Sequence, residues 1–324
     1  MKNNAHPSWW RRKIKTGSGK RPIPVIPAIV ITCALSIGAY LLVSSIRGQP
    51  VAPAEAAKSF SKTKILETWA SGDRAATLDM ARASLEASPL DPFYLSFNGI
   101  AAYYLTSEKP EGDEKQNLLD ESVFSLRKAI ASGGKLPVKA QVEYVLGKAY
   151  FQKGSPWYDL AAKYLAKSGK DGYKGNDSEQ YLGLSYAGLQ NHELAVEHFE
   201  NALKQGQSDV LMVSAAVSYK ALGNKEKTLE LLSNAVSSAS DALIVQKARF
   251  MLGEMAMEDG ELAKAGELYQ AIIDTDPRSA EAWYRLGLVA EALKDPIKAR
   301  AAWRKASSID PNHIEARRKL ADRL

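Results

Sequence analysis

The residue types most able to carry chemistry are four histidines and one cysteine. His192 and His198 are close in sequence, but their spacing does not place them on one face of a helix, as a zinc-binding pair would require. Cys33 lies in an apolar stretch and has no second cysteine with which to form a disulfide or a thiolate metal site. These residues therefore predict no metal centre.

Other sequence signatures of catalysis are also missing. The chain has no glycine-rich phosphate loop, no nucleophile elbow and no paired metal-ligand motif. Its carboxylates are spaced as they are on solvent-exposed helix surfaces. Because a catalytic function must be argued from a site, we expect a protein that is not an enzyme and has no cofactor and no small-molecule substrate.

A recurring pattern of small and large apolar residues predicts pairs of packed helices. Near the C-terminus, Gly287 and Ala299 let two antiparallel helices approach closely, while Trp283 and Trp303 fill the space between them. The same order of residue types recurs at a period of about 34 residues. The upstream matches are Leu252, Gly253, Ala265, Tyr269, Ile272 and Pro277; Leu182, Gly183, Ala195, Phe199 and Ala202; and Leu146, Gly147, Ala161 and Leu165.

This pattern resembles the tetratricopeptide repeat family, well over residues 92–324 and weakly over 58–91. The resemblance implies an all-α fold, a right-handed superhelix of about six to seven helix hairpins that ends in a cap helix. We expect degenerate helical repeats at 58–139, regular repeats at 140–313 and the capping helix at 314–324.

The resemblance also implies a concave, partner-binding face, lined by fixed positions of the first helix of each hairpin. In this sequence those positions give a groove of Tyr103, Tyr144, Lys148, Phe151, Leu184, Val217, Phe250, Glu254, Met257, Tyr284, Leu288 and Glu291. Apolar and aromatic residues of this kind are typical of protein interfaces. The alternative is that Tyr144, Val213 and Phe250 pack against the next repeat, and that Tyr103 and Tyr104 belong to the hairpin core.

The N-terminal region has the composition of a membrane anchor. Residues 28–46 contain no charged residue and, at about 1.5 Å per residue, are just long enough to cross a bilayer core. All charged residues before Glu55 are basic, and seven of them lie in 1–27, so the positive-inside rule places the N-terminus in the cytoplasm. We predict a basic cytoplasmic tail at 1–27, one transmembrane helix at 28–46 and a linker at 47–57.

With this topology the chain is a single-pass protein of the inner (cytoplasmic) membrane, and its repeats lie in the periplasm. The alternative is a cleaved signal peptide, for which Ala52, Pro53 and Ala54 offer small residues at a suitable spacing. The apolar stretch is longer than the usual core of a signal peptide, which favours the anchor.

The charge distribution disfavours binding of nucleic acid. The chain has 43 basic and 37 acidic residues, and without the seven basic residues of the tail the remainder is 36 against 37. A nucleic-acid-binding surface would require basic residues concentrated on the folded part. The expected partners are other proteins on the concave face, and the membrane at residues 28–46.

These observations together predict a membrane-anchored periplasmic scaffold. Such a protein mediates protein–protein contacts in the assembly of a membrane or envelope complex, for example as an accessory of secretion, a pilus or a flagellar motor. The alternative is a periplasmic holdase-like chaperone associated with protein export. A scaffold has a fixed set of partners, whereas a holdase binds unrelated clients.

Overall fold

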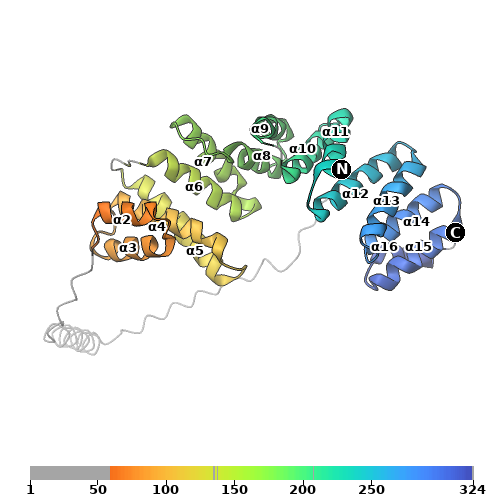
Figure 1. Ribbon diagram of the computed structural model, residues 1–324, viewed down its shortest axis with the longest axis horizontal. Coiled ribbons are helices and arrows are strands. Elements are labelled where there is room, and N and C mark those ends of the chain that lie inside the picture. The colour runs from red at the N-terminus through yellow and green to blue at the C-terminus, as the bar shows by residue number, and fades with distance from the viewer. Residues whose placement is uncertain (1–58, 134–135, 137, 207, 323–324) are drawn as a thin grey trace, which may run out of the picture. The chain divides into compact units, whose positions relative to one another are not determined.

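The computed structural model describes residues 59–133, 136, 138–206 and 208–322. These residues contain fifteen α-helices and no β-strand (Figure 1). None of these helices is both long enough and apolar enough to cross a membrane. The predicted basic tail, transmembrane helix and linker at 1–57 lie outside the described residues.

The helices follow one another as hairpins joined by short turns. Their bounds are α2 Lys62–Ala70, α3 Arg74–Ala87, α4 Pro92–Leu105, α5 Asp113–Ala131, α6 Lys139–Gln152, α7 Tyr158–Lys170, α8 Ser178–Gly188, α9 His192–Gln205, α10 Asp209–Ala221, α11 Lys225–Ser238, α12 Ala242–Glu258, α13 Leu262–Thr275, α14 Ala280–Ala292, α15 Pro296–Ile309 and α16 Ile314–Ala321. The even-numbered helices α2 to α14 are the first helices of seven hairpins, and α16 follows the last hairpin. Each first helix from α4 onward packs on its own second helix and on the second helix before it. This stacking buries the apolar face that a single hairpin leaves exposed.

Four consecutive hairpins use the same tight turn. Two residues after the last residue of the first helix, the backbone is left-handed, at Gln190, Gly223, Gly260 or Lys294. The amide of the next residue then donates to a carbonyl in the last turn of the first helix, as Asn191 does to Tyr186 at 2.9 Å. This is the Schellman arrangement, which satisfies carbonyls at the helix end. The residue that completes it is also the N-cap of the second helix.

The side chain of that N-cap residue starts the second helix in three of the four hairpins. Asn191, Asn224 and Asp295 each accept a hydrogen bond from the amide three residues ahead, at 3.2, 3.1 and 3.0 Å. Such caps satisfy amides that have no partner inside the helix. The end of one helix and the start of the next are thus fixed within two residues, so the turn leaves little freedom in how the hairpin closes.

In five of the seven hairpins, a glycine in the first helix receives a large side chain from the second helix. A Cβ placed on Gly183 would lie 2.5 Å from the Phe199 ring, and one placed on Gly253 would lie 2.6 Å from the Tyr269 ring. Phe199 and Tyr269 are almost completely buried. The other pairs of this kind are Gly99 with Leu126, Gly147 with Leu165 and Gly287 with Trp303. The structure thus confirms the all-α fold and the close helix crossing predicted from the small residues.

Replacement of Gly253 by alanine tests this crossing. The added methyl group has no space against the buried Tyr269 ring, so we expect Gly253→Ala to lower the free energy of unfolding by about 1–3 kcal/mol. Gly266→Ala is the matched control, because a Cβ there would meet only Val289 Cγ1, at 3.6 Å. A helical Gly→Ala change without a clash stabilises by about 0.5–1 kcal/mol. Urea unfolding followed by circular dichroism should therefore shift the two midpoints in opposite directions, and equal shifts would contradict the crossing model.

Candidate protein-interaction face

All twelve predicted groove residues lie on first helices, from α4 to α14. First helices of neighbouring hairpins contact one another from α4 through α12. The Glu254 carboxylate continues this link to α14 through a contact of 3.1 Å with the Arg285 guanidinium. We call the surface formed by the exposed and half-buried side chains of these first helices the first-helix face. Its exposed or half-buried members among the predicted residues are Phe151, Leu184, Val217, Phe250, Glu254, Met257, Leu288 and Glu291.

Four predicted groove residues are buried and do not offer a contact surface. Tyr103, Tyr144, Lys148 and Tyr284 are between 5 and 9 % exposed. The alternative that these tyrosines pack within the helix stack therefore applies to Tyr103 and Tyr144. Tyr144 packs against Tyr173 of the following turn, and Tyr284 packs against His313 at the start of α16, so the elements that follow each hairpin cover these residues.

Lys148 is the centre of a buried polar cluster beneath the N-terminal part of this face. Its ammonium nitrogen lies 4.8, 5.1 and 5.8 Å from the ring centroids of Tyr181, Tyr144 and Tyr103. The same nitrogen lies 2.6 Å from Asp177 Oδ2. Aromatic faces attract a cation through their quadrupole, and a carboxylate neutralises its charge. The cluster thus provides interaction partners for a lysine that would otherwise be buried without a counter-charge.

The tyrosines of this cluster remain neutral at physiological pH. Burial raises the pKa of Tyr103 and Tyr144, and the carboxylate of Asp177 raises the pKa of Tyr144 further. The Tyr144 hydroxyl donates to Asp177 Oδ1, while Gln152 Nε2 donates to the Tyr103 hydroxyl at 3.2 Å. Helices α4, α6 and α8 are therefore connected by one network that includes the turn before α8.

The turn at 171–177 supplies residues that were missing from the sequence prediction. Tyr173 packs against Tyr144 with ring centroids 5.3 Å apart, and Asp177 binds both Lys148 and Tyr144. Gly175 permits this contact, because a Cβ there would lie 2.5 Å from the Tyr144 ring. The prediction considered only helical positions, and these residues lie on a turn. A tyrosine next to a run of polar turn residues between two repeats was the available signal.

A hollow of about 840 Å³ opens beside this cluster. Tyr104, Tyr144 and Tyr173 form its aromatic side, and Asn176, Gln180 and Gln205 provide amide groups. Tyr104 is 37 % exposed. Amide side chains can donate to and accept from a peptide backbone at the same time, while tyrosine faces provide apolar contact with a polar edge. These are the features that an extended protein segment would require.

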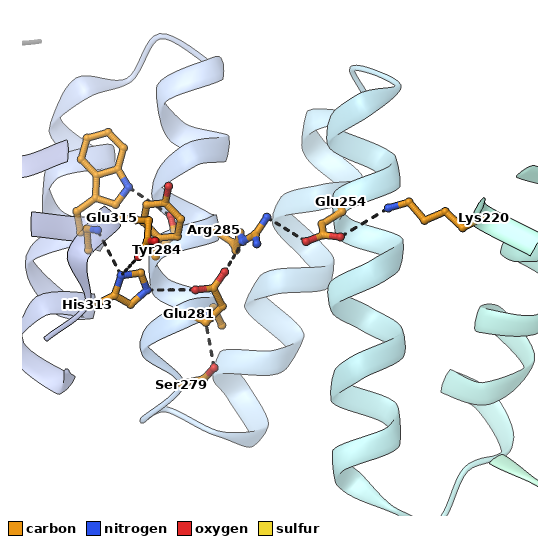
Figure 2. A network of polar contacts seen from close by, with 11 residues as sticks. Lys220, Glu254, Ser279, Glu281, Tyr284, Arg285, His313 and Glu315 are labelled. Atoms are coloured by element: carbon orange, nitrogen blue, oxygen red, sulfur yellow. Dashed lines mark hydrogen bonds and ion pairs between the residues drawn. The ribbon is translucent and has the colours of Figure 1, made fainter. Parts of the chain in front are cut away.

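A second hollow, of about 360 Å³, lies between α12 and α14. It brings together three predicted residues, Glu254, Met257 and Leu288, with Arg285 and Glu258. Figure 2 shows that a chain of charged residues crosses this region. Lys220, Glu254, Arg285, Glu281 and His313 follow one another at separations of 3.7, 3.1, 2.5 and 3.1 Å.

These ion pairs connect the first helices α10, α12 and α14 to the start of α16. Their side chains are about one-third exposed, except for the buried His313. Partly exposed pairs of this kind each stabilise by less than about 1 kcal/mol. Their main effect is to fix the positions of the charged groups beside the hollow. Among the described residues, no group of histidine, cysteine, aspartate and glutamate side chains is arranged to hold a metal ion.

Comparison with known proteins identifies the type of repeat. Two tetratricopeptide repeat models match the sequence, at residues 213–279 and 280–313. The C-terminal part of a TPR repeat-containing protein from Cytophaga hutchinsonii has a similar structure, with 15 % sequence identity and a TM-score of 0.57. That alignment covers 80 % of this chain and 99 % of the other.

Two further solved structures have lower TM-scores. A tetratricopeptide repeat protein from Parabacteroides merdae is 18 % identical, covers 80 % of this chain and 95 % of its own, and has a TM-score of 0.46. A MamA fragment from Desulfovibrio magneticus is 20 % identical, covers 54 % of this chain and 97 % of its own, and has a TM-score of 0.47. No curated protein matches the sequence. The family models thus mark residues 213–313 as tetratricopeptide repeats, and the Cytophaga structure shows that the described helices have a similar fold.

The role of Lys148 can be tested by its replacement with methionine. Lys148→Met keeps most of the apolar stem but leaves the Asp177 carboxylate without its cation, so we expect the free energy of unfolding to fall by about 1–3 kcal/mol. Lys225→Met is the control, because it removes an exposed lysine that pairs with Asp259. An exposed pair contributes about 0–1 kcal/mol. Equal urea midpoints for the two variants would show that the Lys148 cluster does not stabilise the array.

Proposed function

We propose that this tetratricopeptide repeat protein is a scaffold that binds segments of other proteins on its first-helix face. We further propose that residues 28–46 anchor it in the cytoplasmic membrane with the repeats in the periplasm, where it serves assembly of a membrane or envelope complex. Proteins with such repeats generally act through protein–protein contacts. The scaffold function is therefore the conclusion that the site supports best.

One observation carries this proposal. Successive first helices each present an exposed or half-buried apolar side chain, namely Phe151, Leu184, Val217, Met257 and Leu288, and the last two of these line the second hollow. An isolated exposed leucine or valine on a protein surface requires no explanation. A row of them on neighbouring helices, next to a tyrosine- and amide-lined hollow, is a surface suited to a partner.

The membrane anchor makes such a surface effective at modest affinity. Confinement of scaffold and partners to one membrane raises their effective concentration, so weak contacts are sufficient to hold an assembly together. The charge asymmetry before residue 28 supports the proposed orientation. The nearly balanced charge of the remaining chain agrees with partners that are proteins.

Binding on the first-helix face can be tested with Val217→Asp combined with Leu288→Asp. Val217 is 40 % exposed, so its change places a charge in the proposed contact and leaves the buried core intact, whereas Leu288 is half-buried and packs against the core of the last hairpin, so the helix content of the double variant is measured as well. We expect partner recovery after crosslinking in cells to fall at least about tenfold, as for loss of an interface hot spot. Phe124→Asp is the control, because Phe124 is 65 % exposed on a second helix. Unchanged recovery by the double variant, with normal helix content, would contradict this location of the site.

The same crosslinking experiment separates the two functions. A short set of partners in reproducible ratios supports the scaffold. A broad set of unrelated exported proteins, together with suppression of client aggregation by the purified protein, supports the holdase-like chaperone instead. The double variant Val217→Asp and Leu288→Asp should weaken binding in either function, because the scaffold and the chaperone both require the exposed apolar row.

The proposed topology predicts which engineered cysteines can be labelled from outside the cytoplasmic membrane. With Cys33 replaced by alanine, Ser233→Cys places one thiol on the exposed surface of α11, and Ser18→Cys places one in the basic tail. A membrane-impermeant maleimide should label the first in spheroplasts and the second only after lysis. Labelling of both in spheroplasts, or of neither, would contradict the orientation. Release of a shortened protein by alkaline carbonate would indicate a cleaved signal peptide.

A further inference from the structure

A groove separate from the two hollows lies on the side of the last hairpin that faces away from the first-helix face. It has a volume of about 660 Å³ and lies between α13 and α15, with α14 as its floor. At 100° per residue, Leu286, Ala290 and Leu293 lie on the side of α14 opposite to Tyr284, Leu288 and Glu291. A partner in this groove would therefore not compete for the surface proposed above.

The groove has an apolar floor and edges made of small residues. Trp283 and Leu286 are half-buried in its floor, and Leu293 is 58 % exposed at one end. Gly266 on one edge and Ala301 on the other leave the floor accessible, and a Cβ on Gly266 would meet only Val289. Small residues at the edges of a groove allow a helix to approach the floor closely, so that its apolar side chains reach the floor.

The preceding repeat provides an internal comparison. When the two repeats are aligned on their turns and N-caps, Trp283 corresponds to Arg249, Leu293 to Asp259 and Ala301 to Glu267. By the same alignment, Gly266 and Ala263 correspond to Leu229 and Glu226. The equivalent surface one repeat earlier is therefore charged and partly filled. The apolar groove is a feature of the last repeat and not a requirement of the repeat fold.

The charges at the rim indicate the chemistry of the occupant. Lys298 and Lys305 lie on the same edge, two turns apart on α15, which is about 10 Å. The one acidic residue of the lining, Asp295, already accepts a hydrogen bond from the Lys298 amide and lies 3.1 Å from the Lys298 ammonium. Two lysines and one aspartate give the rim a net charge of +1 along its α15 edge, and the Lys298 side chain is 81 % exposed, so it can also contact an acidic side chain of a partner. Acidic side chains seven residues apart on a bound helix would match the spacing of the two lysines.

From these features we infer that the groove between α13 and α15 binds an amphipathic α-helix of a partner protein. The floor from Trp283 to Leu293 is about 15 Å long, which corresponds to about three helical turns. The bound helix places an apolar stripe on this floor and two acidic residues against Lys298 and Lys305. The protein then holds two partners at once, one on each side of its repeats.

The test uses a designed probe and the full chain. The probe is a fluorescent 18-residue helical peptide with leucines in one stripe and two glutamates seven residues apart beside it. Its counterpart carries lysines in place of the glutamates. Fluorescence anisotropy should show saturable binding of the glutamate peptide, at least about tenfold tighter than that of the lysine peptide, because the α15 rim repels cations.

Two kinds of variant locate the binding. Leu293→Asp and Gly266→Leu copy the charge and the bulk of the preceding repeat, and each should weaken binding at least about tenfold. Lys298→Glu combined with Lys305→Glu should reverse the preference between the two peptides. Val217→Asp is the matched control, an exposed apolar residue of the first-helix face whose change should leave peptide binding unaffected.

Several results would overturn the inference. They are equal affinity for both peptides, no saturable binding, or unchanged binding by Leu293→Asp and Gly266→Leu. If sedimentation instead shows a dimer that Leu293→Asp dissociates, while neither peptide binds, the occupant is a second copy of this chain and the inference is wrong. Because Val217→Asp affects only the first-helix face, a failure here is distinguishable from a failure of the proposed scaffold function.

Discussion

The close crossing of two helices at a glycine determines the geometry of the whole array. In five of the seven hairpins, a large side chain of the second helix occupies the space that a Cβ on the first helix would take. Protein interiors are packed as densely as organic crystals, so this contact defines the separation of the two helices to a fraction of an ångström. The next hairpin packs on the surface created in this way. Both interaction surfaces therefore depend on a contact that is itself inaccessible to a partner.

Much of the fold was predictable from the sequence because this crossing leaves a clear signal. A glycine such as Gly253 followed at a fixed interval by an aromatic such as Tyr269 predicts the helix pair and its stacking. The turns carry a local signal too, since Asn191, Asn224 and Asp295 are typical N-cap residues, although no N-cap was predicted from them. The short range of these interactions is the reason that they can be inferred without coordinates.

The candidate site was less predictable because it depends on contacts between hairpins. Family positions placed every candidate residue on a first helix, but they could not distinguish the half-buried Met257 from the buried Tyr144. That difference is decided by how the neighbouring hairpin covers each position. The Asp177–Lys148 ion pair joins a turn to a helix of the preceding hairpin, and no local pattern in the sequence indicates it.

The two kinds of connection in this chain differ in how much variation they tolerate. Within the four hairpins from α8 to α15, the left-handed residue and the N-cap follow each other directly, so an inserted residue would break both helix ends at once. Between hairpins, the connection at 171–177 is longer and contributes Tyr173 and Asp177 to the tyrosine cluster. Insertions and deletions in such a connection leave the helix crossings intact. New binding specificity can therefore evolve by changes in the length of these connections, while the helical framework stays the same.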